Sequence, residues 1–116
     1  MTIQDTFSQT FSGTGTGSPV TIANGSSTAE AVTIQVSGTF TAKLYLEGTV
    51  FGSGDNNWKM IAGINLSDMS LVTADPYING AGVYIFCVEG LDRIRINVSS
   101  YTSGTITVSG CTYRTV

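Results

Sequence analysis

The chain contains no histidine, few charged residues and only two cysteines. Without histidine, the commonest general base and metal ligand is missing, and Ser–His and Cys–His nucleophilic systems are excluded. Charged residues make up 11% of the 116 residues, against about 25% in an average soluble domain. Threonine, serine and glycine take their place. A surface of neutral hydroxyl groups suits a protein that packs against others in an assembly.

Long apolar runs and clusters of positive charge are also missing. The net charge of −3 is spread over isolated residues, so there is no basic patch for nucleic acid. The N-terminus lacks the positive and apolar regions of a signal peptide. No apolar run approaches the roughly 18 residues that span a membrane. We therefore expect no signal peptide, no membrane segment and no nucleic-acid partner.

The two cysteines do not make a disulfide framework. Cys87 lies in the apolar run 83–88, where a small buried hydrophobic residue is expected. Cys87 and Cys111 can pair only if their strands are neighbours. The sequence leaves that pairing open.

The dominant periodicity of the chain is two, which is typical of strands with one buried face. Apolar and polar residues alternate at 32–36, 44–47, 94–98 and 106–109, and clusters of Gly, Asn, Asp and Ser separate the strands. Residues 82–88 are apolar on both sides and predict a central strand covered on both faces. We expect one all-β domain over 1–116, a single antiparallel β-sandwich, jelly-roll-like, with about eight strands and little or no helix.

The chain contains an internal repeat. Residues 32–48 align without gaps on residues 94–110: in both, an alternating strand ends in Val-Ser, a short turn follows, and a second alternating strand ends at glycine. We expect two similar hairpins. Their placement in equivalent parts of two sheets and a chance similarity between alternating strands are both open.

The first 18 residues differ in kind from the rest. Residues 12–18, SGTGTGS, have the composition of a flexible linker, while Phe7 and Phe11 are apolar anchors in a polar segment. Residues 1–18 are either a first strand of the sandwich followed by a loose turn, or an N-terminal arm that adds a strand to a neighbouring subunit. Both alternatives need Phe7 and Phe11 buried.

Catalysis finds little support in the pattern of carboxylates. A glycosidase needs two carboxylates about 5–10 Å apart across a cleft. Glu47 and Glu89 each lie on an expected strand next to a glycine, but nothing makes them face one another. Carboxylates at strand ends are usually solvated or hydrogen-bonded to turns. We expect neither an enzyme nor a cofactor.

The segment 51–60, FGSGDNNWKM, is the strongest candidate for a binding loop. Asp55, Asn56 and Asn57 carry oxygens of the type that Ca²⁺ prefers, but six or more oxygens are needed and no second acidic cluster lies nearby. A hairpin turn with Asx hydrogen bonds explains these residues better. We therefore expect a turn that faces a ligand or a neighbouring molecule, and no metal.

Trp58, the only tryptophan, leaves two interpretations open. Sugar-binding sandwiches place an exposed aromatic ring beside Asn and Asp, as in residues 55–58. The alternation of Trp58 with Met60, Ala62 and Ile64 instead favours a tryptophan that faces the core. On another strand, Arg93 and Arg95 share one face with Asn97, and a solvated face is expected there.

Several strand and turn segments, taken together, resemble a known class of protein. They are Phe11–Gly15, Val36–Phe40, Leu44–Trp58, Val83–Glu89, Gly90–Arg95 and Thr102–Gly110. This pattern resembles the small β-sandwich virion proteins of tailed bacteriophages, which occur as head decoration (cement) proteins, head fibres or tail-fibre modules. The resemblance covers most of the chain, and its motifs are structural rather than catalytic.

The resemblance implies a virion structural protein made in the host cytoplasm. In its leading form it implies a capsid decoration protein, a homotrimer on the outer surface of the phage head that binds the major capsid protein and stabilises the shell. Phe7 and Phe11 would then contact the capsid or another subunit. The alternative is a tail-fibre or baseplate module that binds host surface glycan, with residues 55–58 facing the ligand.

Overall fold

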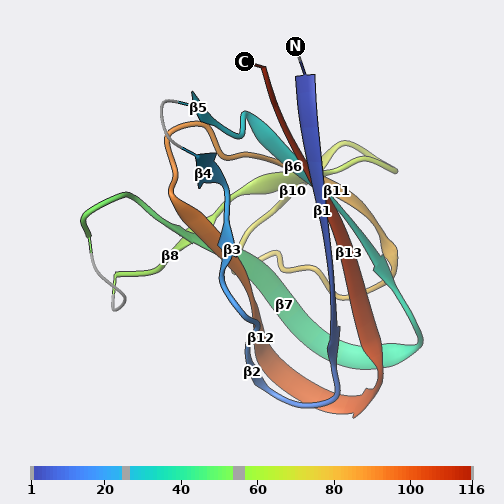
Figure 1. The fold of residues 1–116 in the computed structure, drawn as a ribbon. Coiled ribbons are helices and arrows are strands. Elements are labelled where there is room, and N and C mark those ends of the chain that lie inside the picture. Colours follow the sequence, from blue (N-terminus) through green and yellow to red (C-terminus); the bar gives the residue numbers. More distant parts are fainter. Residues whose placement is uncertain (1, 25–26, 54–56, 116) are drawn as a thin grey trace.

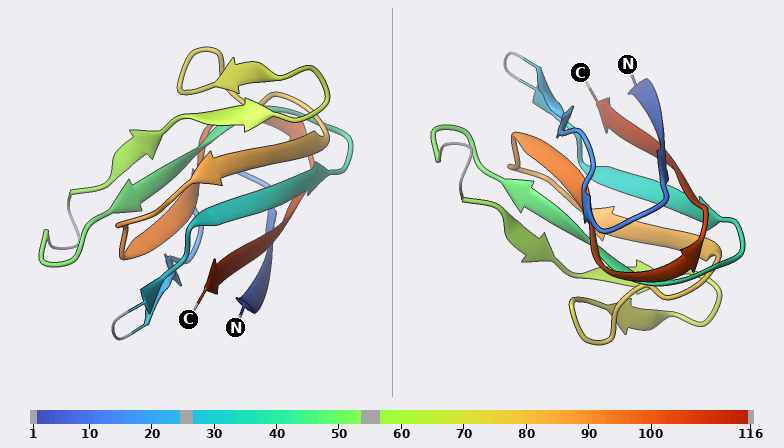
Figure 2. Two further views of the ribbon diagram at one scale, coloured as in Figure 1. Left: turned by 90° about the horizontal axis from the view of Figure 1, so that it is seen from above. Right: turned by 90° about the horizontal axis from the view of Figure 1, so that it is seen from below.

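The structure is a computed structural model that describes residues 2–24, 27–53 and 57–115. Two antiparallel β-sheets pack face to face (Figure 1; Figure 2), which confirms the all-β antiparallel sandwich. Sheet A has the strand order β1-β13-β6-β11-β9-β10, and sheet B has the order β2-β12-β7-β8, with β3 also paired to β12. None of the described residues lies in a helix, so no helix of that part of the chain is a candidate membrane span.

Long strands form the body of the sandwich, and short ones complete it. The long strands are β1 (Thr2–Phe11), β6 (Ala31–Ser37), β7 (Phe40–Thr49), β11 (Gly82–Cys87), β12 (Arg93–Gly104) and β13 (Ile106–Thr115). The short strands have two or three residues each: β2 (Gly15–Thr16), β3 (Val20–Thr21), β4 (Ala23–Asn24), β5 (Ser27–Thr28), β8 (Lys59–Ile61), β9 (Gly63–Asn65) and β10 (Ser70–Val72).

The core lies between the sheets and follows the alternation seen in the sequence. Alternate residues of the long strands point inward and are almost fully buried: Val32, Ile34, Val36, Leu44, Leu46, Ile94, Ile96, Val98, Ile106 and Val108. Each apolar side chain buried in this way contributes about 1.5–3 kcal/mol relative to an exposed one. The period-two pattern therefore identified the inward faces of these strands correctly.

The two repeated segments are β-arches, in which two consecutive strands belong to different sheets, rather than hairpins, in which the two strands pair. β6 lies in sheet A and β7 in sheet B, while β12 lies in sheet B and β13 in sheet A. The first strand of each repeat pairs with the second strand of the other, β6 with β13 and β12 with β7. The hairpin prediction is wrong because alternation shows which side chains face the core, not which strand lies alongside. The two repeated segments do occupy equivalent places in the two sheets.

The turns of the two arches lie against each other. Gly38 joins β6 to β7 at φ 109°, and Gly104 ends β12 at φ 96°, a region that residues with a Cβ rarely adopt. A Cβ on Gly38 would overlap the carbonyl oxygen of Thr105, and one on Gly104 would overlap the carbonyl oxygen of Thr39. The two glycines therefore allow the backbones of the two turns to approach closely.

The N-terminal segment is an edge strand of its own chain. β1 pairs with β13 without interruption from Thr2↔Thr115 to Phe11↔Ile106, and the two termini lie side by side in Figure 1. Phe7 and Phe11 are half-buried and pack against the core. Transfer of this segment to a neighbouring subunit stays a prediction.

β11 is covered on one face only. Tyr84 and Phe86 are buried between the sheets, but Val83 and Ile85 are only half-buried and Cys87 is exposed. The prediction of a strand covered on both faces, with a buried Cys87, is wrong for the single chain, because the described residues form two layers and none covers the outside of sheet A (Figure 2). Cys87 and Cys111 are both free thiols, and β6 lies between their strands.

Substituting Gly104 by alanine tests the contact between the arches. A Cβ would both strain a positive φ and overlap the opposite turn, so we expect the free energy of unfolding to fall by about 2–5 kcal/mol. Urea unfolding measures this difference.

Gly90→Ala is the matched control. Gly90 has a similar φ of 90°, and nothing lies within 4 Å of its added Cβ, so only the strain of about 1–3 kcal/mol applies. Equal losses for the two variants would show that the arches do not depend on this contact.

Candidate functional site

A row of polar side chains crosses the outer face of sheet B, where β12 pairs with β7. The strand register places Arg93 opposite Thr49, Arg95 opposite Glu47, and Asn97 opposite Tyr45. Because alternate residues of a strand share a face, these side chains lie on the outside while their neighbours fill the core. We call Tyr45, Glu47, Arg93, Arg95 and Asn97 the polar row.

Arg95 is the centre of the polar row. Its Nε donates a hydrogen bond of 2.8 Å to Oε1 of Glu47, and Glu47 is only 8% exposed. The Arg95 guanidinium lies 4.3 Å from the centre of the Trp58 ring and that of Arg93 lies 5.2 Å from it, distances suited to cation–π attraction. The expected solvated strand face is therefore a packed one.

Trp58 lies on the outside of sheet B, so the prediction of a core tryptophan is wrong. Met60 pairs with Glu47 of β7 and is 40% exposed, and Trp58, two residues earlier, is half-buried beside the arginines. The alternation was misleading because the chain leaves sheet B at Ala62 and continues in sheet A as β9. Trp58 and Met60 do share a face, but it is the outer one.

The connection between β7 and β8 is a hairpin, as predicted, because these strands pair antiparallel. Asp55 and Asn56 lie outside the described residues. Asn57 is exposed, and its Nδ2 donates to the Ser53 carbonyl oxygen at 2.6 Å.

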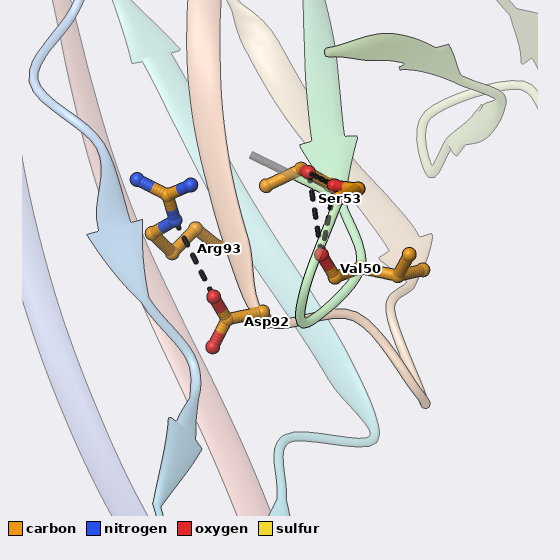
Figure 3. Close-up of polar contacts among 5 residues, drawn as sticks. Val50, Ser53, Asp92 and Arg93 are labelled. Carbon is orange, nitrogen blue, oxygen red and sulfur yellow. Dashed lines mark hydrogen bonds and ion pairs between the residues drawn. The ribbon is translucent and has the colours of Figure 1, made fainter. Parts of the chain in front are cut away.

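Hydrogen bonds within the connection hold its first residues in place. Ser53 Oγ donates to the Val50 carbonyl oxygen at 2.8 Å and is hydrogen-bonded to Thr49 Oγ1 (Figure 3). Beside it, Arg93 Nε lies 3.4 Å from Oδ2 of Asp92. Within the described ranges no group of three or more Cys, Asp or Glu side chains could hold a metal ion.

The two groups with shifted pKa values lie outside the polar row. The pKa of Asp68 is lowered because its carboxylate accepts hydrogen bonds from the side chain and the backbone of Ser70. The pKa of Tyr84 is raised by burial and by the nearby charge of Asp68; its hydroxyl donates to the Gly80 carbonyl oxygen at 3.0 Å. The pKa shift of Asp68 thus follows from its turn, and that of Tyr84 follows mainly from burial.

Among the side chains that the structure describes, none at the outward strand positions of sheet A is charged. The residues that point outward there are Gln4, Thr6, Ser8 and Thr10 of β1, Thr107, Ser109, Cys111 and Tyr113 of β13, Ala31, Thr33, Gln35 and Ser37 of β6, Val83, Ile85 and Cys87 of β11, and Ile64 and Leu71 of β9 and β10. We call this surface the neutral face. The charged residue Glu30 lies at its rim.

The neutral face is hollowed in two places. A shallow hollow of about 620 Å³ is lined by hydroxyl and amide side chains, Thr6, Ser8, Thr33, Gln35 and Ser109, together with apolar residues such as Phe7 and Val83. A second hollow of about 480 Å³ is mainly apolar and is lined by Ala31, Ile64, Leu71, Ile85, Cys87 and Tyr113 among others. Leu71 is 53% exposed and Tyr113 is 42% exposed. Sequence reasoning missed this surface, although the two-sided apolar pattern of 82–88 was its signal.

The two packed antiparallel sheets place the chain among the β-sandwiches. The backbone fold is similar to that of the SPBc2 prophage-derived protein YomS, with a TM-score of 0.77 and 18% identity over 97% of this chain and 95% of YomS. The PBSX exported protein XepA has a similar fold, with a TM-score of 0.76 and 19% identity over 95% of this chain, which spans 38% of XepA.

Comparisons at the level of sequence do not identify a relative of this chain. No protein-family model matches the chain, and no curated protein matches it. Similarity at this level of identity shows the fold alone.

Replacing Glu47 by glutamine tests the packing of the polar row. The variant removes the charge that compensates Arg95 in a mostly buried setting, so we expect the free energy of unfolding to fall by about 1–3 kcal/mol. Urea unfolding at neutral pH measures the loss.

Glu89→Gln is the control, because Glu89 is exposed in the turn after β11 and surface changes usually stay within about 0.5 kcal/mol. If Glu47→Gln were as mild as this control, the ion pair would not contribute to the stability of the sandwich.

Proposed function

We propose that this chain is a non-enzymatic structural protein of a bacteriophage particle and, more specifically, a decoration protein on the outer surface of the head. The observation that carries the proposal is the uncovered side of β11. Val83, Ile85 and Cys87 are apolar residues on a central strand, yet no part of the described chain covers them. A partner that packs on the neutral face would bury them.

The size of the neutral face suits an interface. The six strands of sheet A have between three and ten residues each, and the usual strand spacing of about 4.8 Å and rise of about 3.3 Å per residue give the area of the face. The resulting area of roughly 600–700 Å² approaches the roughly 800 Å² per partner of a standard protein interface.

The chemistry of the face suits a permanent contact. Hydroxyl and apolar groups lose little on leaving water when they find matching partners, whereas buried charges are costly. The fold neighbour YomS is described as prophage-derived, which supports a phage origin, and the sequence resemblance to virion proteins points the same way. The partner we propose is the major capsid protein.

Charges placed on the neutral face should weaken this contact. We expect Thr33→Lys with Gln35→Lys to lower the affinity for undecorated heads of the encoding phage by more than 10-fold, because two ammonium groups would have to be buried. Co-sedimentation with purified heads, followed by densitometry, measures the bound fraction.

Ser100→Lys with Thr102→Lys is the matched control, because both residues are exposed on β12 of sheet B. The control should bind like the unmodified chain, and that binding should change little with salt, since screening acts on charges. Equal occupancy of both double variants would exclude the neutral face as the capsid contact.

A second candidate function is supported by the position of Trp58. The ring lies on the outside of the sandwich beside the polar row, where Asn97 Nδ2 donates to Tyr45 Oη at 3.2 Å. Aromatic rings next to amide and hydroxyl groups are the usual elements of a sugar-binding surface. This arrangement favours the fibre or baseplate module that binds host glycan.

Trp58→Ala separates the two candidates. For a glycan-binding module, the substitution should abolish binding to a glycan array, while Thr33→Lys with Gln35→Lys should leave it unchanged. For a decoration protein, the unmodified chain should bind no glycan, and Trp58→Ala should bind heads normally.

A further inference from the structure

The edges of the two sheets are unequal. Sheet B ends in β8 on one side and in β2 and β3 on the other, and sheet A ends in β10 on one side; these strands have two or three residues each. Short edge strands are one of the ways in which proteins prevent unwanted strand pairing. The remaining edge of sheet A is β1, which has ten residues.

β1 has few of the features that protect an edge; one of them is Asp5, which shares the core-facing side of the strand with Phe7. It contains no proline, lysine or arginine, and Asp5 is its only charged residue. Its register with β13 is unbroken over all ten residues, so no bulge twists the edge away. The following turn reaches only the far end of the strand, where Gln9 Nε2 donates to the Ser18 carbonyl oxygen at 2.9 Å. A long, regular and nearly uncharged edge is a template for another strand.

We propose that β1 pairs antiparallel with β1 of a second copy of this chain, so that two A sheets form one continuous sheet. A strand that joins this edge must continue the core on one side and present neutral polar groups on the other. β1 meets both needs itself: Phe7 and Phe11 point toward the core, and Thr6 and Ser8 lie on the neutral face.

The partly exposed rings of Phe7 and Phe11 support this choice of partner. Both pack against the core but remain half-buried, so the core is incomplete at this edge. A second β1 would bring its own phenylalanines to the same layer. The outward residues of both strands are neutral, and Asp5, on the core-facing side, is the only charged residue in the β1 strand of each copy.

The pairing goes beyond the proposed function and does not depend on it. A two-fold contact closes after two copies and leaves no free long edge, unlike the homotrimer that the resemblance implied. It would place two neutral faces side by side in one surface. Because the isolated chain should form the dimer, the test needs no phage particle, and a failure to bind heads would leave the pairing intact.

The first test is the mass of the purified chain in solution. We expect light scattering with size-exclusion chromatography to give about 24 kDa, twice the 12.1 kDa of one chain. Thr6→Lys with Ser8→Lys places charges on the edge strand and should give a monomer with an unchanged far-UV spectrum. Gln35→Lys with Ser37→Lys, on central β6 of the same face, should stay a dimer. A monomeric unmodified chain, a trimer, or the reverse response of the two variants would overturn the proposal.

The second test locates the two-fold axis. In a chain with Cys87→Ser and Cys111→Ser, single cysteines are introduced at Gln4, Thr6, Ser8 and Thr10, and the chain is oxidised. In an antiparallel pair only the position nearest the axis meets its own copy, so covalent dimer should peak at one position and fall on both sides. Ser70→Cys, on edge strand β10, should give none. Equal cross-linking at every position would overturn the pairing.

Discussion

The sandwich depends on the close contact between two turns, at Gly38 and Gly104. Each turn carries the chain from one sheet to the other, and each glycine allows its backbone to lie against a carbonyl oxygen of the opposite turn. This contact interlocks the two repeated segments, so that β6 pairs with β13 and β7 pairs with β12. In interlocked arches, consecutive strands lie in opposite sheets. This arrangement determines which strands are neighbours, and therefore which side chains lie next to one another on each outer face.

The two outer faces that result have opposite characters. On sheet B, charged groups of the polar row are paired within one chain, since Arg95 binds Glu47 and lies beside Trp58. On sheet A, apolar side chains of β11 lie beside threonine and serine, and no described part of the chain covers them. Because the described part of one chain leaves these apolar side chains uncovered, we propose that the protein functions in an assembly.

The inward residues of the strands could be predicted from the sequence, because period-two alternation reports directly on burial. Strand pairing could not, since a hairpin and an arch have the same alternation. Trp58 was misplaced for a related reason: its alternation with Ala62 and Ile64 continues across a change of sheet. Cys87 was expected to be buried because its neighbours are apolar, and the pattern does not say whether the covering layer belongs to the same chain. The neutral face could be located only once the register was known.

If the proposed function is correct, a partner covers the neutral face in the assembled particle. Cys87 is a natural probe, because it is an exposed free thiol on that face. The direct measurement is the rate at which a maleimide alkylates Cys87 in intact particles that carry this chain, compared with the purified chain. We expect alkylation at least about 10-fold slower in the particle, with full reactivity restored on denaturation. Equal rates in the particle and in the free chain would exclude a partner over the neutral face.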